Sequence, residues 1–189
     1  SVKIISATDH YKEEKHDHVV FILSDQSKIV YNDPRRFGMI FTVASDDIEQ
    51  HSAFKHLGPE PLSNNFSADL LLKKLRTKKT PIKQALLDQR VVVGVGNIYA
   101  CEALYDSNIS PLKPSNSLTL RETEQLTRSI QKILTRAIEA GGSTLKDYRH
   151  TDGSLGYFQH QFAVYDQEGS PCPDPKCTCD DTGGIKRIV

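Results

Sequence analysis

The stretch from Thr119 to Gly142 constrains the fold more than any other part of the sequence. It opens with Thr119-Leu-Arg-Glu122, a pattern in which the Thr and Glu side chains accept hydrogen bonds from each other's backbone N–H groups. Apolar residues then recur at spacings of three and four, on one face of a helix: Leu126, Ile130, Ile133, Leu134, Ala137 and Ile138. Gly141 and Gly142 follow, as at many helix ends. The stretch predicts one long amphipathic helix packed on a core.

Strand patterns dominate the first part of the chain and helix patterns the middle. Apolar runs at 19–23 and 28–31 flank a polar turn and predict a hairpin, and 37–43 predicts a further strand. Three shorter helices are expected at 68–76 behind Ser67, from Thr80-Pro81 to Asp88, and at 98–107 behind Asn97. Short strands are expected at 162–165 and 185–189. Strands, then helices, then a small cysteine-bearing end predict an α+β fold.

Charge has to be read locally, because 24 Lys and Arg residues balance 24 Asp and Glu residues. The whole-chain field therefore gives no support to nucleic-acid binding. One segment without acids carries six cations: Lys73, Lys74, Arg76, Lys78, Lys79 and Lys83. Such a cluster can neutralise several phosphates. The alternative is a solvated helix face, although most such faces mix the two signs.

Two motifs suggest contacts with a nucleic acid. Gly94-Val-Gly96-Asn97 opens a predicted helix, where free backbone N–H groups attract phosphate; a tight turn into a capped helix explains the same residues. Asp33-Pro-Arg-Arg-Phe-Gly38 places two arginines beside an aromatic ring that could fill the gap left by an unstacked base. The alternative is a turn in which Arg35 or Arg36 pairs with Asp33, and the motif alone does not decide.

The end of the chain suggests a metal site and a substrate loop. Cys172 and Cys177 can supply half of a tetrahedral zinc site, with Cys179 as a strained third ligand; unpaired thiols are the alternative. The polar, glycine-containing segment 142–157 is a candidate lid, with an ordinary surface loop as the default. No apolar run approaches the roughly 18 residues of a membrane span.

These motifs, in this order, closely resemble the formamidopyrimidine-DNA glycosylase family of bacterial repair enzymes. The similarity covers essentially the whole chain. The segments that carry it are His16-Asp-His18, Asp33–Gly38, His56-Leu-Gly-Pro-Glu-Pro-Leu62, Lys79-Thr80, Ile82-Lys83, Val93-Gly-Val-Gly-Asn-Ile-Tyr-Ala100, Gly142-Ser-Thr-Leu-Lys-Asp147 and Gly156-Tyr-Phe158.

The resemblance implies three domains and a set of site residues. Residues 1–58 would be part of an N-terminal β-sandwich, 59–150 a helix–two-turn–helix domain, and 151–189 the end of the lesion loop with an incomplete zinc finger. Gly96 and Asn97 would hold a DNA phosphate. The remaining implied roles are the DNA contacts His16, Arg35, Phe37, Lys78 and Lys83, the lesion-base loop with Ser143, Thr144, Lys146 and Tyr148, and the zinc ligands Cys172 and Cys177.

The resemblance also implies a reaction. The family removes 8-oxoguanine and formamidopyrimidines from duplex DNA through a Schiff base and cuts the strand by β/δ-elimination. Its N-terminal catalytic proline and glutamate are not matched here, since residue 1 is Ser. We therefore expect a chain truncated at both ends, catalytically inactive but able to bind DNA, from a monomeric protein of the bacterial cytoplasm. The alternatives are an endonuclease VIII-type enzyme for oxidised pyrimidines and a non-catalytic DNA-binding module.

Overall fold

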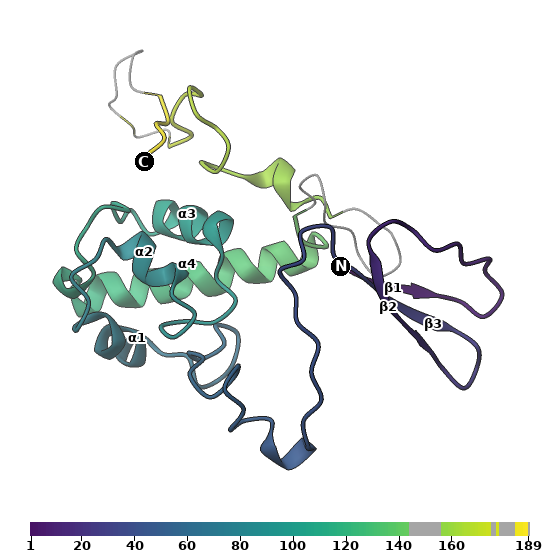
Figure 1. The fold of residues 1–189 in the computed structure, drawn as a ribbon. Coiled ribbons are helices and arrows are strands. Elements are labelled where there is room, and N and C mark those ends of the chain that lie inside the picture. The colour runs from purple at the N-terminus through teal and green to yellow at the C-terminus, as the bar shows by residue number, and fades with distance from the viewer. Residues whose placement is uncertain (144–155, 175–176, 178–183, 189) are drawn as a thin grey trace. The chain divides into compact units, whose positions relative to one another are not determined.

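The computed structural model describes residues 1–143, 156–174, 177 and 184–188 (Figure 1). The chain forms two compact units. The first unit combines Ser1–Ala44 with Ala137–His160, and the second combines Ser45–Arg136 with Gln161–Val189. Within the described residues, no helix has the length and apolar character that crossing a membrane requires.

The first unit contains a three-stranded antiparallel sheet. Its strands are β1 (Val2–Ile5), β2 (Asp17–Ile22) and β3 (Lys28–Asn32), in the order β1-β3-β2. The predicted hairpin is confirmed as β2 and β3, and the Leu23 N–H donates to the Ser27 carbonyl to close the turn. In the central strand, Val30 is fully buried.

The strand predicted at 37–43 is wrong. The described structure has no strand there, and the apolar side chains are turned to solvent, with Phe37 76% and Met39 80% exposed. A strand exists only where a neighbouring strand accepts its backbone hydrogen bonds. In the part of the chain that the structure describes, this apolar run has no such neighbour.

The second unit is built from helices around one apolar core. These are α1 (Ala68–Leu75), α2 (Ile82–Leu87), α3 (Asn97–Asp106) and α4 (Leu120–Glu139), whose last residues from Ala137 on belong to the first unit. Short 3-10 turns occur at Ser45–Asp47, Ser115–Ser117 and Phe158–Gln161. The long helix predicted at 120–140 is therefore confirmed. Leu126 and Ile130 are buried in the core as expected, but Ile138 is 66% exposed and does not belong to the apolar face.

The predicted N-cap is confirmed for α1 and is wrong for α2 and α3. Ser67 caps α1, since its Oγ accepts from the Leu70 N–H at 3.2 Å. Thr80 does not cap α2; Pro81 is the N-cap, because the Thr80 carbonyl is already held by the Ser115 backbone N–H and hydroxyl. Asn97 does not cap α3 either. It is the first helical residue, and Gly96 is the N-cap.

The capping box at the start of α4 is confirmed. The Glu122 Oε2 accepts from the Thr119 N–H at 2.9 Å, and the Thr119 Oγ1 accepts from the Glu122 N–H at 3.3 Å. Lys113 forms an ion pair with the same carboxylate. The Lys113 hydrogen bond and the Thr119 N–H together lower the pKa of Glu122 from 4.5 to about 2.

Glu122 makes the helix start sensitive to acid. A carboxylate with a lowered folded-state pKa stabilises the fold above its unfolded pKa, and the effect is lost as the pH falls through the folded pKa. We expect Glu122→Gln to lower the free energy of unfolding by about 1 kcal/mol at pH 6. The difference should shrink between pH 4.5 and about pH 2. Urea unfolding at several pH values measures it, with the exposed Glu124→Gln as control; a pH-independent difference would contradict the assignment.

The two strands expected near the end of the chain are wrong. Residues 162–165 form bends and the start of a turn, and the Glu102 carboxylate accepts from the backbone N–H groups of Ala163, Val164 and Tyr165. Residues 184–188 form no strand, although Ile185 exchanges backbone hydrogen bonds with Gly169 and Ser170. Val189 lies outside the described residues. In residues 162–165, the backbone N–H groups donate to the Glu102 side chain instead of to a neighbouring strand.

Candidate nucleic-acid interface

The turn before α3 is held in shape by one side chain, Gln89. Its Oε1 accepts from the Gly94 N–H at 2.8 Å, while its Nε2 donates to the Leu87 and Val95 carbonyls at 3.3 Å. Gly94 has φ +81°, a conformation that favours glycine. Gln89 thus connects both sides of the turn. Sequence analysis missed it, since a glutamine five residues before a glycine is not a recognisable signal.

We expect Gln89→Ala to loosen this turn without unfolding the unit. The Gly94 amide loses its acceptor, so its hydrogen exchange should become about tenfold faster, the equivalent of one lost hydrogen bond. NMR-detected exchange of the Gly94 amide measures this. Gln84→Ala, at an exposed position of α2, is the matched control and should leave the rate unchanged. An unchanged rate in Gln89→Ala would show that the side chain does not hold the turn.

Gly96 leaves the start of α3 open. Its backbone is extended, with φ −98° and ψ −177°, and no side chain caps the helix. Apart from its two chain neighbours, none of the described residues has a heavy atom within 4 Å of the place where a Cβ would stand. The first N–H groups of a helix have no intrahelical partner, and the helix dipole adds positive potential there. Gly96 and Asn97 are both exposed, so this end of α3 can accept an anion.

The run from His56 to Leu62 forms hydrogen bonds with the residues that lead into the turn before α3. The Gly58 N–H donates to the Gln89 carbonyl at 2.7 Å, and the Val93 N–H donates to the Pro59 carbonyl at 3.2 Å. A Cβ at Gly58 would stand 2.7 Å from the Val91 carbonyl group, closer than real Cβ contacts allow. Val91 itself is buried. The run from His56 to Leu62 therefore has a structural role: it packs directly on the residues that lead into the turn.

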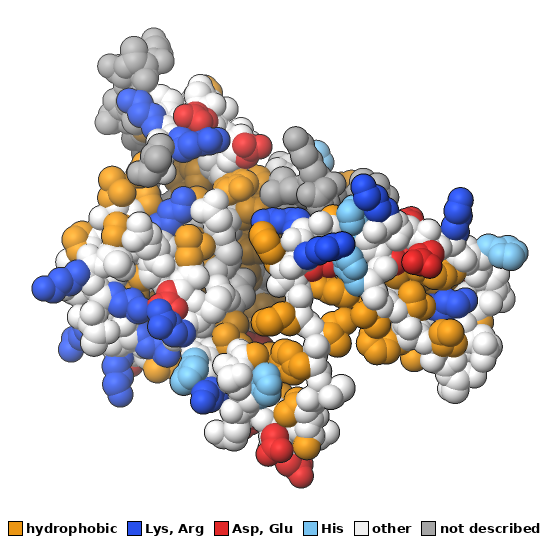
Figure 2. All heavy atoms as spheres, viewed as in Figure 1, with side chains coloured by type: hydrophobic (Ala, Val, Ile, Leu, Met, Phe, Trp, Pro, Cys, Tyr) orange, Lys and Arg blue, Asp and Glu red, His pale blue; other side chains and the backbone are white. Residues whose placement is uncertain are grey.

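The cationic cluster is partly neutralised. The Lys78 Nζ lies 2.8 Å from Asp88 Oδ2, and Arg90 binds the same carboxylate through its Nε at 2.8 Å. The Arg90 and Lys78 hydrogen bonds hold the pKa of Asp88 far below its ordinary value. Lys83 is half-buried, whereas three members are exposed: Lys73, Arg76 and Lys79. On the face drawn in Figure 2, Lys and Arg side chains gather around the part of the second unit that carries α1. The interpretation as a uniformly solvated face does not describe Lys78.

The Asp33–Gly38 motif belongs to the first unit and forms a turn around its aspartate. The carboxylate accepts from the Tyr31 hydroxyl at 2.8 Å and from the backbone N–H groups of Gly38 and Arg36 at 2.8 and 3.1 Å. The Gly38 bond, followed by the Tyr31 bond, lowers the pKa of Asp33. Among the described residues, no arginine side chain pairs with this carboxylate, so the ion-pair interpretation of the motif is wrong.

Arg35 and Phe37 instead pair with each other. The Arg35 guanidinium lies over the Phe37 ring, 4.7 Å from its centroid, in a cation–π contact. Phe37 is 76% exposed, so the pair presents a planar surface to solvent. His16 is half-buried beside this motif, and its carbonyl accepts from the Asp33 N–H. These three residues lie in the first unit, while Lys78, Lys83, Gly96 and Asn97 lie in the second.

Only part of the predicted loop and metal site is described. Ser143 has a buried Oγ without a hydrogen-bond partner among the described residues, and Thr144, Lys146 and Tyr148 lie outside them. Cys172 and Cys177 are free, half-buried thiols. Burial, with the Cys172 thiol nearby, raises the pKa of Tyr105 on α3. In the described part no group of three or more His, Cys, Asp or Glu side chains could hold a metal. The described thiols are at most half of a zinc site.

Comparisons with known proteins identify the family of the chain. Residues 57–149 match the formamidopyrimidine-DNA glycosylase H2TH domain. Formamidopyrimidine-DNA glycosylase of Rhodospirillum rubrum is 48% identical over 180 residues, which cover 95% of this chain and 64% of that relative. The chain therefore spans less than two thirds of the length of this curated relative.

Solved structures show the same similarity. The crystal structure of the MutM (Fpg) protein from Thermus thermophilus matches with a TM-score of 0.84 and 38% identity, over 100% of this chain and 67% of that one. The wild-type Lactococcus lactis Fpg in complex with N7-benzyl-Fapy-dG-containing DNA matches with a TM-score of 0.84 and 32% identity, over 99% and 65%. The α+β class and the helix–two-turn–helix domain are confirmed, and the chain belongs to the formamidopyrimidine-DNA glycosylase family.

Proposed function

We propose that the whole protein removes oxidised purines, 8-oxoguanine and formamidopyrimidines, from duplex DNA. We further propose that residues of this chain make many of its contacts with the duplex. The observation that carries the proposal is the open start of α3 at Gly96, where no side chain of the described residues forms a capping hydrogen bond. Family membership and the DNA complex of the Lactococcus lactis relative support it. The domain division at residues 58 and 150 is part of the proposal and is supported by the H2TH match at 57–149.

In this proposal, the site residues have different roles in rotating a damaged base out of the duplex. A damaged purine inside a duplex must rotate out before chemistry can reach it, at a cost of a few kcal/mol. Gly96 and Asn97 hold a backbone phosphate, and Lys78, Lys83 and His16 make further backbone contacts. Arg35 and Phe37 fill the space that the base leaves, which their exposed planar pair suits. Ser143 begins the loop over the flipped base, which Thr144, Lys146 and Tyr148 continue.

The reaction and the metal belong to the whole protein. An amine attacks the sugar carbon, the base departs, and the resulting Schiff base permits strand cleavage by β/δ-elimination. We assign no catalytic residue to these 189 residues. Zinc, with Cys172 and Cys177 as two of its ligands, would supply folding stability rather than chemistry. Because the relatives are bacterial and the substrate is DNA, we place a monomeric enzyme in the cytoplasm.

DNA binding by this chain is the direct test. We expect the 189-residue chain to bind a fluorescein-labelled 8-oxoguanine duplex, with log affinity falling against log salt at a slope of about −3, as for three or four neutralised phosphates. Fluorescence anisotropy across a KCl series measures the slope. A slope near zero would contradict binding through the backbone.

The lesion class is tested on the whole protein. Borohydride should trap a covalent adduct with an 8-oxoguanine duplex in preference to a thymine-glycol duplex. Preference for thymine glycol would instead favour the endonuclease VIII-type activity. Absence of an adduct with either duplex, together with retained binding, would favour a non-catalytic DNA-binding protein.

A further inference from the structure

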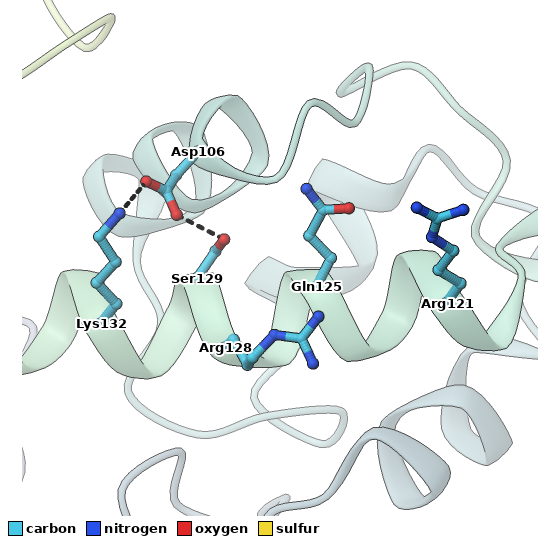
Figure 3. Close-up of a pocket in the computed structure, with 6 residues that line it drawn as sticks. All are labelled: Asp106, Arg121, Gln125, Arg128, Ser129 and Lys132. Atoms are coloured by element: carbon cyan, nitrogen blue, oxygen red, sulfur yellow. Dashed lines mark hydrogen bonds and ion pairs between the residues drawn. The ribbon is translucent and has the colours of Figure 1, made fainter.

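The outward side of α4 carries a groove that the proposed function does not use. Five of its six lining residues belong to α4: Arg121, Gln125, Arg128, Ser129 and Lys132. The sixth, Asp106, stands at the end of α3 and points toward Lys132 and Ser129 (Figure 3). The groove has a volume of ≈ 530 Å³, and all its residues belong to the second unit.

At one end of the groove, the charged and polar side chains already bind one another. The Asp106 Oδ1 pairs with the Lys132 Nζ at 2.6 Å, and its Oδ2 accepts from the Ser129 hydroxyl at 2.7 Å. The Lys132 and Ser129 hydrogen bonds lower the pKa of Asp106, against the effect of its burial. The positive charge of Lys132 is therefore balanced within the protein. This leaves the two arginines as the charges that the groove offers.

Arg121 and Arg128 have no such partner. Among the described residues, no carboxylate oxygen lies within 4.0 Å of either guanidinium. Glu124 stands four residues before Arg128, the order and spacing that favour an ion pair on a helix, yet the pair does not form. Other cations of the second unit do pair, as Lys78 and Lys113 show. The two arginines are left to solvent.

Helix stability does not account for Arg121. It stands in the first turn of α4, where the helix dipole is positive and a cation is unfavourable. Glu122, the acid of that turn, is bound to Lys113 and Thr119 instead. An unpaired cation at this end of the helix adds to the positive potential in front of the groove and attracts an anionic partner.

The spacing of the groups indicates the partner. Arg121 and Arg128 are seven residues apart, or about 10 Å along the helix axis. A peptide in the extended polyproline II conformation has three residues per turn and rises about 3.1 Å per residue, so side chains at positions i and i+3 lie on one side about 9 Å apart. Two carboxylates with that spacing match the spacing of the two helix positions from which the arginines extend, and a guanidinium group binds a carboxylate in a bidentate manner.

Gln125 favours a peptide over a nucleic acid strand. Along α4 it lies between the two arginines (Figure 3), and all three residues line the groove. Its amide both donates and accepts hydrogen bonds, as a peptide backbone does, whereas a phosphate backbone only accepts. We propose that Arg121, Gln125 and Arg128 form a docking surface for an extended acidic segment of a partner protein, with one carboxylate three residues after another and each bound by one arginine.

A labelled peptide tests the proposal with the whole chain. The probe is a fluorescein-labelled octapeptide with two glutamates separated by two alanines, and the spacing control has the same composition with adjacent glutamates. We expect saturable binding of the probe and weaker binding of the control. Arg121→Glu/Arg128→Glu should weaken probe binding at least about tenfold. Lys12→Glu/Lys55→Glu makes the same change in net charge at exposed positions and should change affinity less than about twofold.

Each other outcome overturns the proposal. Equal binding of both peptides, or equal loss in both double variants, would reduce the effect to net charge. No binding of the probe would show that the groove does not take this ligand. An equal loss of duplex DNA affinity in Arg121→Glu/Arg128→Glu would make the surface a nucleic-acid contact. Circular dichroism checks folding, and Arg121→Gln/Arg128→Gln replaces the reversal if that variant does not fold. Gly96→Asp should retain peptide binding, which separates this site from the proposed DNA contact.

Discussion

Gly96→Asp is expected to weaken DNA binding by this chain by about 100-fold while leaving it folded. The new carboxylate would accept hydrogen bonds from the first N–H groups of α3, the same groups that we propose for a phosphate. It would also place a negative charge where the phosphate has to approach. Anisotropy with the 8-oxoguanine duplex at one fixed salt concentration measures the loss.

The structure explains why the fold should tolerate this change. Gly96 has extended backbone angles that any residue adopts, and the space around a Cβ is open. Aspartate is also among the best N-cap residues, slightly better than glycine. The free energy of unfolding of Gly96→Asp should therefore stay equal to that of the natural chain or rise by a few tenths of a kcal/mol.

Two further substitutions at Gly96 isolate the cause. Gly96→Ala adds a Cβ in the same open space without a cap or a charge, so it should bind DNA nearly as the natural chain does. Gly96→Ser adds a neutral cap and should fall between. If Gly96→Asp bound DNA as well as Gly96→Ala, the start of α3 could not be the phosphate site.

Glu102→Ala is expected to lower the free energy of unfolding by about 3–5 kcal/mol. Glu102 is 2% exposed, and its carboxylate accepts three backbone N–H groups at 2.8–3.0 Å, those of Ala163, Val164 and Tyr165. Removal of the acceptor leaves three half-buried donors without this partner. A loss of this size is a large share of the roughly 5–15 kcal/mol that holds a domain folded.

The loss should begin in the segment that Glu102 holds. Urea unfolding gives the global value, and hydrogen exchange at residues 163–165 should accelerate more than exchange in the core of the second unit. Glu102→Gln keeps one acceptor oxygen but turns an NH₂ group toward the donors, so an intermediate loss is expected. Glu139→Ala, at an exposed position of α4, should cost less than about 0.5 kcal/mol. Unchanged exchange at 163–165 in Glu102→Ala would contradict the assignment.

Elements whose signals are local could be predicted from the sequence. The Thr119–Glu122 capping box marks the start of α4 because its partners stand three residues apart. The β2–β3 hairpin was predictable for the same reason, since two apolar runs flank one short polar turn. Residues 37–43 carry an equally apolar run and form no strand, because a strand depends on a neighbour that the run itself does not specify.

The candidate site was predictable in composition more than in geometry. Gly96 and Asn97 were recognised as the start of a helix, but which of them caps α3 depends on backbone angles that their order does not reveal. Lys78 was expected to meet phosphate, and the structure adds its ion pair with Asp88. Glu102 did leave a trace, because an acid stands inside the apolar run from Ala100 to Leu104. Gln89 left none.

The tight approach of Gly58 to Val91 has a consequence for genetics. A side chain at position 58 would displace the residues that run into the Gly94–Gly96 turn, although it would never touch a ligand. In a phenotypic screen, an allele with Gly58 replaced should therefore resemble an allele with Gly96, the proposed phosphate site, replaced. Substitutions at positions 58 and 91 should therefore co-vary among descendants, because a change in the backbone at one position requires an adjustment at the other.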